Sequence, residues 1–96
     1  MSSELEQGDL VRSVAGRDAG QVYAVVGFVE DGRVLVSEGD RRTLRRPKRK
    51  NRRHLVKVGR LEAITASRLQ CRRARDEEIK KSIGDFCAIL QHKGAC

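Results

Sequence analysis

Residues 22–37 hold the pattern that most restricts the fold of this chain, two β-branched runs separated by a tight turn. Residues 22–29 contain four valines and two aromatic side chains in eight positions. A run this short and this rich in β-branched residues favours a strand over a buried helix. Asp31 and Gly32 then form a turn pair, and residues 33–37 supply a second run, so the segment predicts an antiparallel hairpin.

Three further segments complete the expected sheet. Residues 10–15 are rich in β-formers and stop at Gly16, and residues 54–58 form a short apolar run. Residues 41–46 have Leu44 as their one apolar side chain and end before Pro47, which predicts a fourth strand at an edge of the sheet. Five short strands joined by tight turns predict a mostly β fold, a small antiparallel barrel that leaves no exposed edge.

After Gly59 the apolar spacing changes from period 2 to period 3.6, which predicts one or two C-terminal helices. The helical stripes consist of Leu61, Ile64 and Leu69, and then of Ile79, Ile83, Phe86 and Leu90. We therefore expect a barrel over residues 1–58 and a helical extension over residues 59–96. The second stripe either packs against the barrel or binds a protein partner.

Charge is strongly segregated along the 96 residues, whose net charge is +8. Residues 1–40 carry three basic and eight acidic side chains, whereas residues 41–60 carry eleven basic and no acidic ones. Such a dense basic segment beside a folded unit is typical of phosphate neutralisation, and it indicates a nucleic-acid partner. The alternatives are a solvated basic loop or a nuclear import signal.

Other classes of site find little support in the sequence. Cys71, Cys87 and Cys96 are odd in number and fit neither a disulfide framework nor a zinc motif with His54 or His92, so we expect free thiols, no metal and no cofactor. No nucleophile, base and orienting acid can be placed together, so we do not expect an enzyme. The first residues lack a signal peptide pattern and no long apolar run exists, which predicts a cytoplasmic protein without a membrane partner.

Residues 8–57 resemble the KOW motif, a strand–glycine loop–strand unit within an SH3-like barrel. The resemblance rests on the loop at residues 16–20, the valine run after it, the turn and strand at residues 31–36, and the basic stretch that closes in Arg53, His54 and Leu55. These features look like those of large-subunit ribosomal proteins of the archaeal and eukaryotic fourteen-e type, and the chain as a whole looks like a compact bacterial KOW protein.

The resemblance implies an SH3-like barrel that binds structured ribosomal RNA, with large-subunit rRNA and the ribosome as partners and a role in translation. Loop contacts to RNA are expected from Arg12, Arg17, Gly20 and Gln21. Phosphate contacts are expected from Arg41, Arg42, Arg45, Arg46, Lys48, Arg49, Lys50, Arg52 and Arg53. Because aromatic residues make up only 3% of the chain, shape-based recognition is favoured over base stacking. The alternative is a protein-interaction module of the transcription-elongation KOW type.

Overall fold

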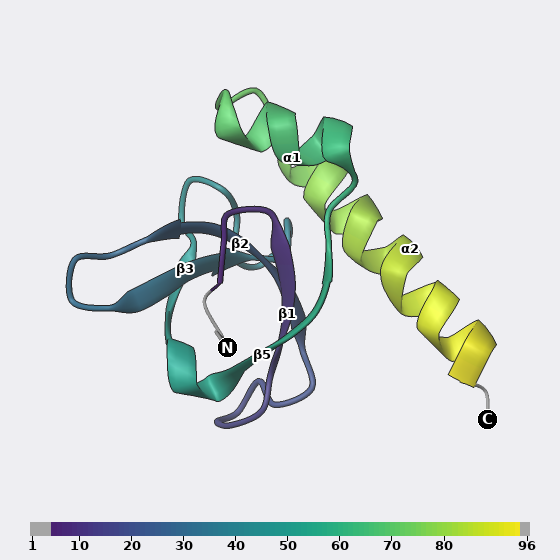
Figure 1. The fold of residues 1–96 in the computed structure, drawn as a ribbon, viewed down its shortest axis with the longest axis horizontal. Coiled ribbons are helices and arrows are strands. Elements are labelled where there is room, and N and C mark those ends of the chain that lie inside the picture. The colour runs from purple at the N-terminus through teal and green to yellow at the C-terminus, as the bar shows by residue number, and fades with distance from the viewer. Residues whose placement is uncertain (1–4, 95–96) are drawn as a thin grey trace.

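The computed structural model describes residues 5–94, with side chains described through residue 89, as five antiparallel strands followed by two helices (Figure 1). The elements are β1 (Asp9–Ser13), β2 (Val22–Phe28), β3 (Arg33–Ser37), β4 (Lys48–Asn51), the short 3₁₀ helix η1 (Arg52–His54), β5 (Leu55–Arg60), α1 (Ala63–Gln70) and α2 (Asp76–Gly94). The predicted fold class, a small mostly β domain with C-terminal helices, is confirmed.

The strand order is β4-β3-β2-β1-β5, with every neighbouring pair antiparallel. The two outermost strands, β4 and β5, are consecutive in the chain and are joined only by the three residues of η1. Asn51 and Leu55 are four residues apart and can be separated by at most about 14 Å, so the sheet must curl until its two edges approach each other. Figure 1 shows this curled, barrel-like arrangement.

Alternating side chains divide the apolar residues between two cores. Val11, Val25 and Val34 are at most 1% exposed and fill the inside of the curled sheet together with Val36, Tyr23 and Leu55. Leu10, one position before Val11, faces the opposite way and packs under the helices. A period of two residues therefore places neighbouring side chains of the same strand in different cores.

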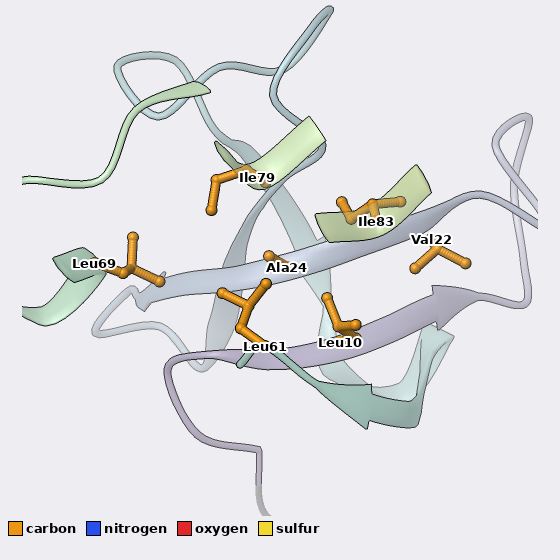
Figure 2. Close-up of a cluster of buried hydrophobic side chains, with 7 residues drawn as sticks. All are labelled: Leu10, Val22, Ala24, Leu61, Leu69, Ile79 and Ile83. Atoms are coloured by element: carbon orange, nitrogen blue, oxygen red, sulfur yellow. The ribbon is translucent and has the colours of Figure 1, made fainter. Parts of the chain in front are cut away.

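The second core joins the outer face of β1 and β2 to both helices, as Figure 2 shows. Ile79 and Ile83 lie on α2 above Val22 and Ala24 of β2. Leu69 of α1 and Leu61, which lies between β5 and α1, complete this cluster. Ile79, Ile83 and Phe86 of the predicted stripe thus pack against the barrel, and the side chain of Leu90 lies outside the described part of the chain. Part of α2 continues past the sheet in Figure 1, and no helix within residues 5–94 is both long enough and apolar enough to span a membrane.

The expected fourth strand at residues 41–46 is wrong, because β4 begins only at Lys48. Residues 41–46 form bends whose backbone groups bond locally and to α2. The Glu38 and Gly39 amides donate to the Arg42 carbonyl, and the Leu44 amide donates to Asp76 Oδ1 at 2.7 Å. These hydrogen bonds take the place of the ladder that a strand at residues 41–46 would form with a neighbouring strand.

The expected end of the barrel at residue 58 is also too early. The fifth strand begins at Leu55 and continues through Gly59 to Arg60, and His54 belongs to η1. Gly59 is tolerated inside β5 because its missing side chain leaves room for the ring of Phe86 from α2.

Candidate nucleic-acid interface

The connection between β1 and β2 is a tight loop whose shape depends on two glycines. Gly16 and Gly20 have φ values of +88° and +96°, a region that other residues rarely adopt. The Gly20 amide donates to the Ser13 carbonyl at 2.8 Å, and the Gln21 amide donates to the Asp18 carbonyl at 2.9 Å. A Cβ atom added at Gly20 would meet nothing within 4 Å, so a partner can approach the loop backbone there.

The carboxylate of Asp18 fastens this loop to the rest of the barrel. Its Oδ1 accepts hydrogen bonds from Lys50 Nζ at 2.7 Å and from Ser13 Oγ at 2.9 Å. Its Oδ2 accepts from the Tyr23 hydroxyl at 2.6 Å and from Lys48 Nζ at 3.0 Å. A single side chain therefore holds the loop against β2 and the basic strand β4 (these five residues are named here the Asp18 cluster).

Opposing effects set the protonation of this cluster. Burial favours the neutral form of Asp18, but the hydrogen bonds from Lys50, Tyr23, Lys48 and Ser13 outweigh it and hold the pKa of Asp18 well below its usual range. Burial, together with the adjacent Asp18 carboxylate, raises the pKa of Tyr23 well above its ordinary value. The cluster thus keeps an ionised Asp18 beside a neutral Tyr23 over the whole physiological range.

Two of the lysines predicted to contact phosphate pair with a carboxylate inside the protein. Lys50 is buried, and its ammonium group donates to Asp18 and to the Ala15 carbonyl at 3.1 Å, so it is not free to neutralise a phosphate. Lys48 is partly exposed but is also paired with Asp18. Asp18 was not among the predicted site residues. The one signal for it is that residues 41–60 contain no acid, so any internal pairing of their lysines needs a carboxylate from elsewhere in the chain.

A polar depression of about 630 Å³ lies between the loop and the bend after β3. Arg17, Gly20 and Gln21 line one side, and Arg41 and Arg42 line the other. The bend is fixed by Glu38, whose Oε1 accepts from the Asp40 amide at 2.9 Å and from the Arg42 amide at 2.7 Å. Glu38 also lines the depression, together with Asp18, Ala19, Tyr23 and Lys48.

The other predicted contacts are distributed over the surface outside this depression. Arg45 lines a separate hollow, Arg12 lies on β1, Arg49 lies on β4, and Arg52 and Arg53 lie in η1. All nine predicted arginines are exposed, and within the part of the chain whose side chains are described none has a carboxylate oxygen within 4.0 Å. They are Arg12, Arg17, Arg41, Arg42, Arg45, Arg46, Arg49, Arg52 and Arg53.

This arrangement suits phosphate groups chemically. A guanidinium presents a planar fork of N–H donors that matches two phosphate oxygens, and three such forks, from Arg17, Arg41 and Arg42, line one depression. Tyr23 is 3% exposed and donates its hydroxyl to Asp18, so its ring offers no stacking surface for a base. Among residues 5–89, whose side chains are described, no three His, Cys, Asp or Glu side chains lie together as a metal site would need.

Comparison with known proteins adds no assignment: no described protein family matches the chain, and no curated protein is significantly similar to it.

Proposed function

We propose that this protein binds structured RNA through the arginine-lined depression and the basic surface beside it, and that it acts on the ribosome or in translation. The observation that carries the proposal is the set of nine exposed arginines without an internal carboxylate partner in the described part of the chain. Unpaired guanidinium groups on the basic segment, on the adjoining loop and on β1 together attract a polyanion.

The chemistry supports recognition of backbone and shape more than of sequence. Phosphate contacts fix the position of a protein on a nucleic acid but carry little sequence information. Structured RNA is recognised largely through its shape, its phosphates and its 2′-hydroxyls, whereas single-stranded RNA is usually read by stacking bases on aromatic rings. The depression offers arginines, loop backbone and Gln21, and it buries its one tyrosine.

The resemblance to KOW proteins makes the proposal more specific. It points to large-subunit rRNA as the partner. The sequence itself, without a signal peptide pattern or a recognisable catalytic or metal-ligand set, favours a cytoplasmic binding protein with neither enzymatic activity nor a cofactor. The Gly16–Gly20 loop that carries the resemblance is the same loop that forms one wall of the depression.

Sedimentation with purified ribosomal subunits across a salt gradient tests this proposal. We expect co-sedimentation with the large subunit that is lost steeply as salt rises, because displacement of counterions from phosphates dominates the affinity. The Arg17→Lys variant should associate more weakly at the same net charge, since lysine lacks the bidentate fork.

A protein-interaction module of the transcription-elongation type would behave differently. Docking of a protein through a mostly apolar face depends only mildly on salt. Such a module would therefore show no salt-sensitive co-sedimentation with either ribosomal subunit. That outcome would refute the ribosomal proposal.

A further inference from the structure

The connection between α1 and α2 contains a basic run that the proposed RNA surface does not use. Arg72, Arg73 and Arg75 follow Cys71 directly, and all three arginines are exposed. Arg72 and Arg45, which is 27 positions earlier in the chain, both line a hollow of about 480 Å³. A hollow of this size falls within the usual range for binding pockets, about 300 to 1,000 Å³.

The floor of this hollow is aliphatic. Val26 and Leu35 come from neighbouring strands, Leu44 comes from the bend before β4, and Leu69 comes from the end of α1. Among the residues whose side chains the structure describes, no aromatic and no acidic one is part of the lining. The nearby carboxylates are engaged, since Asp76 accepts from the Leu44 amide and Glu78 pairs with Arg68 at 3.0 Å.

Arg72 also occupies an unusual backbone position. Its φ is +63°, and it is the one residue other than glycine with a positive φ in the described chain. The Arg72 amide donates to the Leu69 carbonyl, and the next two amides donate to the Arg68 carbonyl, so the position is the left-handed residue that ends α1. Glycine is preferred there, because a side chain adds strain. Arg72 therefore combines a strained backbone position with a place in the lining of the hollow, the combination from which a functional role is best inferred.

We propose that this hollow is a docking site for a short acidic segment of another protein, with an apolar side chain of the segment in the aliphatic floor and its carboxylates on Arg45 and Arg72. Charge complementarity carries the choice of occupant, because the only charged side chains of the lining are these two arginines. An RNA base fits less well, since the lining offers no aromatic ring for stacking. Gln7 is the one uncharged polar side chain among the described residues of the lining. This site shares no lining residue with the depression beside the loop.

Selection from a random 12-residue peptide library against the full-length protein tests the proposal. We expect enriched peptides to carry an aliphatic or aromatic residue flanked by Asp or Glu. The synthetic peptide should shift the methyl resonances of Val26, Leu35, Leu44 and Leu69. The Arg72→Glu variant should bind it about tenfold or more weakly, the loss expected for one charge-assisted contact. The Arg73→Glu variant, with the same change in net charge, should bind like the parent.

Arg72→Gly separates binding from folding. Because glycine relieves the strain of the left-handed position, the melting temperature should stay the same or rise while peptide affinity falls. Failure to enrich acidic peptides, equal losses for Arg72→Glu and Arg73→Glu, or methyl shifts elsewhere would overturn the proposal. Shifts of these methyl groups by a structured RNA but by no peptide would overturn it in favour of an extended RNA surface.

Discussion

At the scale of single residues, one carboxylate organises the candidate RNA-binding surface. Asp18 joins the glycine loop to β4 through Lys48 and Lys50, and the Asp18 side chain is 14% exposed. The loop therefore holds Arg17 at the same depression that Arg41 and Arg42 line. Two lysines thus pair inside the protein, whereas the nine arginines predicted to contact RNA have no carboxylate oxygen within 4.0 Å in the described part of the chain.

Asp18→Asn should destabilise the fold by about 2 to 4 kcal/mol at neutral pH, because it leaves the buried ammonium of Lys50 without a counter-charge. The folded-state pKa of Asp18 is depressed, so its stabilising effect is present above the unfolded-state pKa, about 3.9, and is lost as the pH falls below it. Urea unfolding of parent and variant at pH 7 and pH 3 should show a smaller difference in stability at pH 3. A difference that does not change with pH would contradict an ionised Asp18 in the folded protein.

Lys50 and Arg49 make a matched pair of neighbours that face opposite ways. Lys50→Gln should lower the free energy of unfolding by about 1 to 3 kcal/mol, since it removes a charged hydrogen bond from a buried site. Arg49→Gln lies on the exposed side and should stay within about 0.5 kcal/mol of the parent. Structured-RNA affinity should respond in the reverse order, with the larger loss for Arg49→Gln. Equal losses of RNA affinity for the two variants, measured where both are fully folded, would contradict this prediction and identify Lys50 as a ligand contact.

At the scale of elements, the local sequence pattern was sufficient to predict the structure where side chains alternate along a strand and turns are tight. The β2–β3 hairpin follows from its valines and the Asp31-Gly32 pair, and Gly32 has the positive φ that such a turn needs. The apolar stripe of α2 likewise predicts the side that packs on β2. Val25 and Val34 lie in the core inside the curled sheet, as their place in the hairpin predicts.

The β4 strand and the lysine pairing could not be derived from local pattern. β4 is Lys-Arg-Lys-Asn, a sequence without an apolar side chain, and it joins the sheet by pairing with β3 while Lys50 points to Asp18. The contact between Lys50 and Asp18 joins residues that are 32 positions apart in the chain. Residues 41–46 bond to α2 instead, through a contact with Asp76 that equally spans 32 positions. Long-range polar contacts of this kind leave no periodic signal in a sequence.

The docking of α2 can be tested at two glycines. A Cβ atom at Gly59 would lie 2.7 Å from Phe86 Cε1, so Gly59→Ala should force the ring of Phe86 to move and cost about 1 to 3 kcal/mol. At Gly84, on the exposed side of α2, a Cβ atom meets nothing within 4 Å. Gly84→Ala should raise stability by about 0.5 to 1 kcal/mol through helix propensity. Thermal unfolding measures both, and a neutral Gly59→Ala would contradict the packing of α2 against β5.

At the scale of the whole molecule, two cores share one sheet. The inner core holds the curled strands, and the outer core attaches both helices, so the C-terminal part adds to the same folded unit as the barrel. The bend at residues 38–46 links the barrel to α2, since Gly39 packs against Asp76 and Lys80 at the start of that helix. The position of Arg41 and Arg42 in the depression therefore depends on α2 as well as on the barrel.

The central claim is that Arg17, Arg41 and Arg42 act together on phosphate groups, and its most direct test is the salt dependence of RNA binding. The measurement compares the parent with the variant in which all three arginines are replaced by glutamine. The control variant carries Arg73→Gln, Arg75→Gln and Lys81→Gln, which removes the same charge from exposed positions outside the depression. Each phosphate contact contributes about 0.7 to 0.9 to the slope of log affinity against log salt.

We predict that the slope for a large-subunit rRNA fragment falls by about 2 in the depression variant and changes little in the control variant, with both melting like the parent. Equal slopes for the two variants would contradict the account, because they would show that RNA responds only to the net charge of the protein and not to the arginines placed around the loop.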